Sequence, residues 1–181
     1  MKILYVRHGK SVANANLTIG KPDTPLAEEG LEQARVTGQD LRSHNVTAIV
    51  CSSFIRAQQT AEIIAAELGI PIHDITSIDE LHERRMGSLE GESRESYGTS
   101  YFYDNDTDNN FESHDAVIAR SQLALQKVIA VAEQTAGCTV VVGHAVSGFF
   151  LLQVAKGKSQ YSDFEPFNQL NNAEIVEIKT K

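Results

Sequence analysis

Residues 1–14 read MKILYVRHGKSVAN, and this stretch decides how the chain begins to fold. Its apolar run, residues 3–6, is continuous and does not alternate with polar residues, which is typical of a strand buried on both faces. The run ends abruptly at Arg7 and His8. Two basic side chains at the end of a buried strand indicate either a solvated loop or an anion-binding site.

Strand-like and helix-like segments alternate along the rest of the chain. The helices are indicated by apolar stripes, by capping candidates such as Ser52 and Ser53, and by stop signals such as Gly69. This alternation predicts an α/β layered fold with a mostly parallel sheet. The expected strands are 3–6, 46–51, 70–75, 138–142 and 173–178, and the expected helices start at Thr24–Pro25, run from Ser52–Ser53 to Leu68, and cover 113–134 and 146–154.

Polar side chains follow three of the expected strands at the point where each strand ends. Arg7 and His8 follow the first strand, and Arg56 lies shortly after the second. His144 follows the strand at 138–142. Because ligands of open α/β sheets bind in the crevice at the carboxyl ends of the strands, we expect two arginines and two histidines at one functional edge.

The bulk composition narrows the class of ligand. The chain has 181 residues, a formal net charge of −8 and a pI near 5.2, so its summed field repels nucleic acids and anionic membrane surfaces. We therefore expect neither a nucleic-acid nor a membrane partner. An anionic ligand is expected to be small and to be held by a local cluster of positive charge.

The length fits a single domain over residues 1–181, with a cap-like excursion at about 88–112. The two cysteines, Cys51 and Cys138, match no metal-site spacing, so reduced thiols in a reducing compartment are expected. Residues 1–6 are too few for a secretory apolar region, and no apolar run reaches membrane-spanning length. The sequence thus predicts a cytoplasmic protein, and it leaves the oligomeric state open, with a homodimer as one option.

The predicted edge carries side chains that suit phosphoryl transfer. Arginine presents a rigid, permanently charged fork that matches phosphate oxygens. Histidine attacks phosphorus only as the neutral imidazole, and neighbouring arginines disfavour its protonated form. The leaving oxygen still requires an acid, and Glu83 in LHERRMGSLEG is the best-placed carboxyl, although Glu80 and Glu90 are close by.

Each of these residues also has a purely structural interpretation. Charged residues at strand and helix ends commonly face solvent or form ion pairs, and buried histidines are commonly satisfied by hydrogen bonds. The alternatives are a solvated strand end for Arg7 and His8, a surface ion pair with Glu62 or another acid for Arg56, a hydrogen-bonded core histidine for His144, and salt bridges with Arg84 or Arg85 for Glu83.

Several segments resemble signatures of the histidine phosphatase superfamily, which includes the cofactor-dependent phosphoglycerate mutases and many small phosphatases. RHGKSVAN resembles R-H-G-x-S-x-x-N, except that Lys10 replaces the acid of many relatives and is assigned no role. The other matching segments, in the family's order, are PDTPLAEEGLEQA, CSSFIRAQQTAEII, LHERRMGSLEG and VVVGHAVSGFF. The likeness covers nearly the whole chain and implies a three-layer α/β/α sandwich with a mostly parallel central sheet.

The resemblance also implies roles for individual residues. The catalytic set is His8 as the nucleophile that becomes phosphohistidine, Arg7, Arg56 and His144 as the phosphate clamp, and Glu83 as the acid and then the base for water. The other residues that match phosphate- or substrate-contacting positions are Asn14, Arg84 and Ala145. The family's chemistry implies no metal and no cofactor.

The polar run DNDTDNNFESHD allows a separate hypothesis. Asp104, Asp106 and Asp108 fall at the first, third and fifth positions of a calcium-loop template, and Asp115 falls at its last. The template's glycine is absent, and its glutamate is replaced by the shorter aspartate. A solvated loop is therefore the favoured interpretation of this run.

The same region bears on the choice between hydrolase and mutase. FESHDAVIAR resembles a stretch of phosphatase-type members, which would bring Glu112 and Ser113 to the border of the pocket. The mutases hold a bisphosphorylated intermediate with an arginine pair in this region, whereas this sequence offers only Arg94 between residues 91 and 112. An apolar wall for the substrate's alcohol, or else simple packing, is expected from Tyr97, Tyr101, Phe102 and Tyr103.

The expected activity is therefore metal-independent hydrolysis of a small phosphorylated metabolite through a phosphohistidine. The alternatives are a cofactor-dependent phosphoglycerate mutase and a non-catalytic phosphate-binding or scaffold protein on the same fold. The sequence does not identify the alcohol that carries the phosphate.

Overall fold

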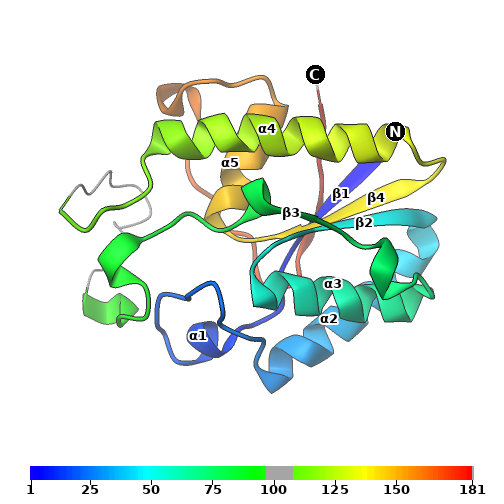
Figure 1. Cartoon of the computed structure of the whole chain (residues 1–181), viewed down its shortest axis with the longest axis horizontal. Helices are drawn as coiled ribbons and strands as arrows, with labels where there is room; N and C mark the ends of the chain where they lie inside the picture. Colours follow the sequence, from blue (N-terminus) through cyan, green and yellow to red (C-terminus); the bar gives the residue numbers. More distant parts are fainter. Residues whose placement is uncertain (97–107, 181) are drawn as a thin grey trace.

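A five-stranded sheet forms the middle layer of the protein (Figure 1). The structure is a computed structural model that describes residues 1–96 and 108–180. The strand order is β3-β2-β4-β1-β5, with β5 antiparallel to β1 and the other neighbours parallel. The strands are β1 Lys2–Arg7, β2 Val46–Ser52, β3 Thr76–Ile78, β4 Cys138–Gly143 and β5 Ile175–Glu177.

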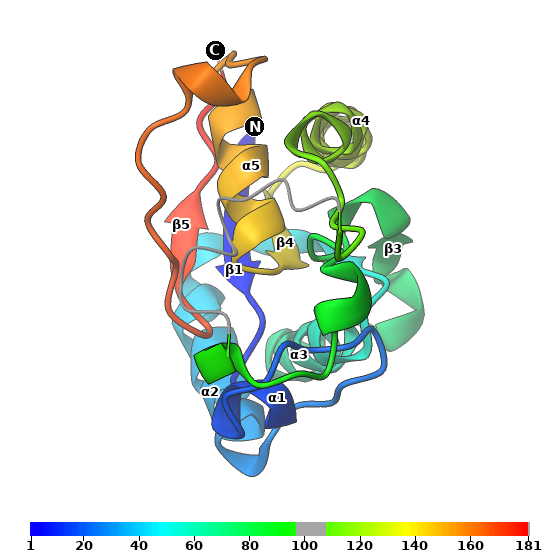
Figure 2. The ribbon, with the colours of Figure 1, turned by 90° about the vertical axis from the view of Figure 1, so that its left-hand side faces the viewer.

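Helices cover both faces of this sheet. Figure 1 shows α4 and α5 above the strands and α2 and α3 below them, and Figure 2 shows the same layers from the side. The helices are α1 Val12–Ala15, α2 Glu28–Leu41, α3 Ile55–Leu68, α4 His114–Glu133 and α5 Val146–Ala155. The chain thus has the expected three-layer α/β/α architecture with a mostly parallel central sheet.

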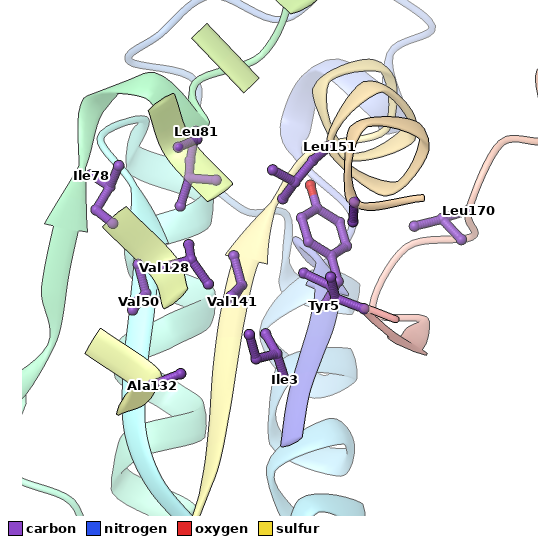
Figure 3. Close-up of a cluster of buried hydrophobic side chains, with 13 residues drawn as sticks. Ile3, Tyr5, Val50, Ile78, Leu81, Val128, Ala132, Val141, Leu151 and Leu170 are labelled. Atoms are coloured by element: carbon purple, nitrogen blue, oxygen red, sulfur yellow. The ribbon is translucent and has the colours of Figure 1, made fainter. Parts of the chain in front are cut away.

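The continuous apolar run of β1 is explained by these two layers, because successive side chains of a strand point to opposite faces. Ile3 and Tyr5 pack into the core that α4 and α5 cover (Figure 3). Leu4 and Val6 pack into the core that α3 covers. All four side chains are buried, so β1 fixes the position of Arg7 and the residue after it.

The second helix begins later than the expected start at Thr24–Pro25. α2 starts at Glu28, because tertiary hydrogen bonds hold the preceding residues extended. The Ala27 N–H donates to the Lys10 carbonyl at 2.9 Å, and the Val12 N–H donates to the Pro25 carbonyl at 3.0 Å. Pairing with residues 10–12 therefore replaces the first helical turn that Pro25 favours locally.

Two other local expectations were wrong. The strand expected at 70–75 is a 3₁₀ turn, Ile72–Asp74, followed by β3 at Thr76–Ile78. The N-cap of α3 is Phe54, while the Ser53 hydroxyl donates to Asp79 at 2.6 Å. The Ser52 hydroxyl accepts the Phe54 N–H at 3.2 Å, so it shapes the strand-to-helix turn without capping the helix.

None of the described helices is both long enough and apolar enough to cross a membrane.

The loop after β1 is held against α2 by two glycines. A Cβ on Gly30 would lie 2.0 Å from the Lys10 carbonyl oxygen, and one on Gly9 would lie 2.4 Å from the Gly30 carbonyl oxygen. The two backbones therefore meet directly. The absent side chain of Gly9 serves this contact with α2.

We expect Gly30→Ala to destabilise the protein and to displace the loop that carries His8. The added methyl group meets backbone that cannot rotate away, a form of overpacking that costs about 1–3 kcal/mol. Urea unfolding monitored by circular dichroism measures the change. Gly69→Ala, whose new methyl group meets nothing within 4 Å but sits at a left-handed φ of 69°, is the comparison for backbone strain alone. Equal or greater stability of Gly30→Ala than of the wild type would contradict the packing account.

Candidate active site

One cavity lies at the carboxyl edge of the sheet, where β1, β2 and β4 end. Arg7 closes β1, Arg56 lies in the first turn of α3, and the turn from β4 into α5 faces them. Polar and charged residues from these elements line the cavity together with a few apolar ones. The lining residues are Arg7, His8, Ser11, Asn14, Ile19, Gly20, Arg56, Glu83, Arg84, Met86, Arg94, Ala145, Val146 and Gln169.

His8 is a neutral imidazole with a defined tautomer. Its Nε2 lies 3.2 Å from the Arg56 Nε–H, which donates to it, so the ring proton is on Nδ1 and is donated to the Gly9 carbonyl at 2.6 Å. Burial, together with the charges of Arg56 and Arg7, holds the pKa of His8 well below its usual range. The ring therefore keeps a lone pair on Nε2 at the cavity.

Arg56 is a buried cation, only 3 % exposed. Its Nη1 donates to the Lys21 carbonyl at 2.8 Å, and its guanidinium lies 5.1 Å from the centre of the Phe54 ring. Burial lowers its pKa to about 10, so it remains charged at neutral pH. The ion pair with Glu62 considered as an alternative is not what holds it.

Arg7 and Asn14 are fixed on the same wall. The Arg7 guanidinium donates to the Leu170 carbonyl. Asn14 closes a capping box at the start of α1, in which its Oδ1 accepts the Ser11 N–H at 3.1 Å. Both side chains line the cavity, as expected.

His144 lies behind His8 and is not among the residues that line the cavity. Their ring centres are 5.2 Å apart. The Ser52 hydroxyl, which accepts the Phe54 N–H, also shares a hydrogen bond of 2.7 Å with His144 Nε2. His144 Nδ1, the other ring nitrogen, is buried and has no hydrogen-bond partner within residues 1–96 and 108–180.

Burial lowers the pKa of His144 well below its usual range, and the charge of Arg56 adds to this effect. Two neutral imidazoles thus lie side by side at the ends of β1 and β4. A buried ring nitrogen without a partner is unusual in a folded protein and marks a place for a ligand or a water molecule.

Glu83 is held by backbone amides and not by a salt bridge. Its Oε2 accepts from the N–H groups of Ala145 at 3.1 Å and Val146 at 3.2 Å. Its Oε1 accepts from Ser147 at 2.8 Å and from Arg84 at 2.9 Å. The carboxyl group therefore sits on the first amides of α5, which is a favoured place for an anionic side chain.

The charged residues near Glu83 in the sequence form ion pairs with other partners. Arg85 pairs with Glu90 at 2.7 Å, and Glu80 pairs with Lys127 at the protein surface. Among the carboxyl groups considered from sequence, only Glu83 lines the cavity. Lys10 pairs with Glu29 at 2.7 Å, on an exposed part of the surface.

Arg84 is buried in the cavity wall, where its Nε donates to the Glu112 carbonyl at 2.9 Å. The expectation that Glu112 and Ser113 border the pocket was wrong. The Glu112 carboxylate pairs with Arg120 at 2.6 Å, which lowers the Glu112 pKa despite its burial, and Ser113 caps α4. The Glu112 carbonyl thus holds Arg84 in the wall, and neither Glu112 nor Ser113 lines the cavity.

Arg94 also lines the cavity, which the sequence argument did not foresee. Its Nε donates to the Thr18 carbonyl at 2.9 Å. Four arginines and one carboxylate thus surround the described part of the cavity, although the whole protein is acidic. This local reversal of charge suits a small anion.

The described residues contain no group of three His, Cys, Asp or Glu side chains that could hold a metal ion. The proposed calcium loop is not tested by this, because Asp104 and Asp106 lie outside the described part of the chain. The expected aromatic wall of Tyr97, Tyr101, Phe102 and Tyr103 lies outside it as well.

Comparison with known families agrees with this geometry. The model of the histidine phosphatase superfamily (branch 1) matches residues 3–181. The chain belongs to this superfamily. The resemblance noted in its sequence motifs therefore holds across the chain.

Individual relatives of the superfamily carry different activities in their names. A protein of Yersinia enterocolitica named probable phosphoglycerate mutase GpmB is 40 % identical over 91 residues, which are 50 % of this chain and 41 % of that protein. The aligned part thus spans less than half of that relative.

Two solved structures of phosphatases share the fold. A mycobacterial glucosyl-3-phosphoglycerate phosphatase, solved with VO3, superposes with a TM-score of 0.82 at 21 % identity over 97 % of this chain and 90 % of its own. A phosphoserine phosphatase mutant of Entamoeba histolytica, solved with phosphoserine, gives a TM-score of 0.73 at 22 % identity over 97 % and 89 %. At these identities the likeness establishes the fold alone.

Sequence reasoning missed several residues of the site. Ser52 looked like a helix cap, but its hydroxyl pairs with His144 from the neighbouring strand. Gln169 comes from the segment before β5, which carries no recognisable motif. Only the folded chain brings Gln169 to the cavity and Ser52 to His144, so neither had a usable signal in the sequence.

Proposed function

We propose that the protein is a phosphomonoester hydrolase that acts through a phosphohistidine on His8. The observation that carries this proposal is the neutral His8 ring, whose Nε2 lone pair faces a buried arginine within a cavity lined by further arginines. Such a site binds the dianion of a phosphomonoester and presents a nucleophile that positive charge keeps unprotonated. The cytoplasmic location expected from the two free, buried cysteines belongs to the same proposal.

In the first step, Arg56 and Arg7 bind oxygens of the substrate phosphate. In the structure the Arg56 Nε–H donates to His8 Nε2. A bound phosphate is a stronger acceptor for the N–H groups of Arg56, so its binding frees the lone pair of His8 Nε2. His8 Nε2 then bonds to phosphorus as the bond from phosphorus to the leaving oxygen breaks. His144 lies behind His8, and the proposal gives its buried Nδ1, in the tautomer that carries the ring proton there, to an oxygen of the transferring group.

Glu83 is the proposed proton carrier of both steps. It lines the same cavity as His8 and is held on the amides that begin α5. In the first step the acid form of Glu83 gives its proton to the leaving alcohol oxygen, which leaves the carboxylate that the four backbone amides hold. In the second step it takes a proton from water, whose oxygen bonds to phosphorus as the bond to His8 breaks, so that phosphate and the free enzyme are restored.

Asn14 and Arg84 complete the proposed contacts to the substrate, whereas Ala145, expected among them, uses its N–H to hold Glu83. Asn14 and Arg84 line the cavity, and the Ala145 N–H points at Glu83 on the same wall. The natural substrate is proposed to be a small phosphorylated metabolite, because the cavity lies at one edge of a small acidic protein. Binding of phosphate without catalysis is the third candidate, and the presence of both His8 and Glu83 in the cavity argues against it.

A phosphoglycerate mutase is the second candidate, favoured by one specific observation. Arg84 and Arg94 give the cavity two cations beyond Arg7 and Arg56, which could hold a second anionic group of the substrate. Interconversion of the two monophosphoglycerates, dependent on added bisphosphoglycerate, tests this candidate. Efficient interconversion without net release of phosphate would displace the hydrolase proposal.

We expect hydrolysis of a generic aryl phosphate to continue at an unchanged rate in excess EDTA. The proposed chemistry uses His8, arginines and a carboxyl group, and it leaves no step for a metal ion. Phosphate release is measured after dialysis against the chelator and again after addition of Mg²⁺. An enzyme that is active only with added metal would contradict the proposal, and so would a wild-type protein that hydrolyses no phosphomonoester in a substrate panel.

A further inference from the structure

Tyr5 is a buried residue of β1 whose hydroxyl bonds to the turn between β4 and α5. The side chain is 1 % exposed and stands in the core between the sheet and α5, with its hydroxyl directed toward that helix (Figure 3). The hydroxyl donates to the carbonyl oxygen of His144 at 2.8 Å. Phenylalanine would fill this part of the core as well as tyrosine does. The hydroxyl group of Tyr5 therefore has a role other than packing.

The His144 carbonyl that accepts from Tyr5 belongs to the same peptide unit as the Ala145 N–H, which donates to Glu83. The His144 carbonyl and the Ala145 N–H lie at opposite ends of one planar trans peptide. The carbonyl end accepts from Tyr5, and the N–H end donates to Glu83 Oε2 at 3.1 Å. The orientation of this single peptide plane therefore connects the Tyr5 hydroxyl to the Glu83 carboxyl group, and a bond at one end strengthens the bond at the other.

The backbone around this peptide is shaped to fit the phenol. A Cβ on Gly143 would lie 2.2 Å from the Tyr5 hydroxyl oxygen, and a Cβ on Gly148 would lie 2.5 Å from it. The two glycines flank the turn from β4 into α5, which carries His144 and the amides that hold Glu83. The turn can thus close on the Tyr5 ring only because both positions lack a side chain.

Tyr5 also remains a donor at every working pH. Burial raises the pKa of its hydroxyl far above the usual range, and the nearby charge of Glu83 raises it further. Its proton therefore stays available to the His144 carbonyl throughout the proposed reaction.

We propose that Tyr5 is a positioning residue that orients Glu83 for proton transfer through the peptide between His144 and Ala145. The inference rests on the proposed function, because it assigns Tyr5 to the proton-carrying side of that reaction. Tyr5 touches neither the substrate nor the reacting atoms. It sets the angle at which the first amides of α5 present the Glu83 carboxyl group.

This role predicts a loss that depends on the leaving group. An alkyl phosphate such as glycerol phosphate needs a proton on its leaving oxygen, whereas the nitrophenolate of an activated aryl phosphate leaves without one. We expect Tyr5→Phe to lower kcat/KM for the alkyl phosphate about tenfold, which is the scale of one lost hydrogen bond. For the aryl phosphate we expect a change of less than about twofold. The ratio kcat/KM is used because it excludes the later hydrolysis of phosphohistidine.

Two control variants test whether the loss is specific to the orientation of Glu83. Ile3→Val trims the same core without touching the turn, so it reports what a general loss of packing does, and it should not change the ratio of the two substrates. In a Glu83→Gln background, Tyr5→Phe should add less than about twofold on the alkyl phosphate, because the group that it orients is already disabled. Equal losses on both substrates, no loss on either, or a full tenfold loss in the Glu83→Gln background would overturn the role of Tyr5.

Gly148→Ala is the second variant, and it covers the case in which Tyr5→Phe folds poorly. Its methyl group pushes the phenol aside while every hydroxyl is kept, so the same selective loss on the alkyl phosphate is expected. An unselective loss or none would contradict the inference. Failure of the proposed function looks different, because the wild-type protein itself would then hydrolyse neither substrate.

Discussion

Replacement of His8 by alanine is expected to abolish turnover, with a fall in kcat on the order of 10⁴- to 10⁶-fold, the scale seen when covalent catalysts lose their nucleophile. The neutral Nε2 of His8 is the one nucleophile that the described cavity places beside Arg56. Alanine leaves the arginines in place, so phosphate should still bind. Initial rates with an aryl phosphate measure the loss, and competition by inorganic phosphate with a fluorescent phosphate analogue measures the retained binding.

His73→Ala is the matched control for this change. His73 is an exposed histidine in the 3₁₀ turn at Ile72–Asp74, on a part of the surface that does not line the cavity. The variant should keep wild-type kcat and wild-type unfolding. If His8→Ala retained more than a small fraction of the wild-type rate, covalent transfer to His8 would have to be abandoned.

Replacement of Arg56 by glutamine is expected to lower kcat/KM about 10²- to 10³-fold, as removal of one preorganised donor to a developing charge does elsewhere. Arg56 is the buried cation that donates to His8 Nε2, and the proposal gives its N–H groups to the substrate phosphate. Glutamine keeps a donor but loses the charge and the fork. Steady-state kinetics with the aryl phosphate measure the change, and Arg35→Gln, on the exposed side of α2, is the control.

The same variant should also move the acid limb of the pH profile. Burial lowers the pKa of His8 first, and the charge of Arg56 lowers it further. Without that charge the His8 pKa rises, so the nucleophile becomes protonated at a higher pH. The acid limb of log kcat/KM, which reports groups of the free enzyme, should therefore shift to higher pH in Arg56→Gln. A shift in the opposite direction would show that Arg56 does not set the protonation of His8.

Much of the fold and about half of the site follow from simple sequence rules. Parallel strands end at one edge of a sheet, so Arg7, Arg56 and His144 could be placed near His8 from the apolar runs that precede them. The continuous apolar run at residues 3–6 predicted a strand buried on both faces, and the structure confirms this. These rules work because they depend on local periodicity and on a general property of α/β sheets.

The parts that could not be predicted depend on contacts between distant segments. The late start of α2 follows from backbone bonds to residues 10–12, which no helix propensity reports. Glu83 was chosen by motif, but its bonds to the amides of α5 join residues more than 60 positions apart. Tyr5 looked like one more core residue, because the partner of its hydroxyl lies 139 residues further along the chain.

The most direct test of the central claim is to trap the phosphoenzyme. The wild-type protein is mixed with an aryl phosphate, quenched in alkali within one turnover, and digested for mass spectrometry, because phosphohistidine survives base and is lost in acid. We predict that one phosphoryl group is found on the peptide that carries His8, that it disappears on acid treatment, and that it is absent from His8→Ala. An active protein whose quenched peptides carry no phosphoryl group, or carry it on another residue, would contradict the account.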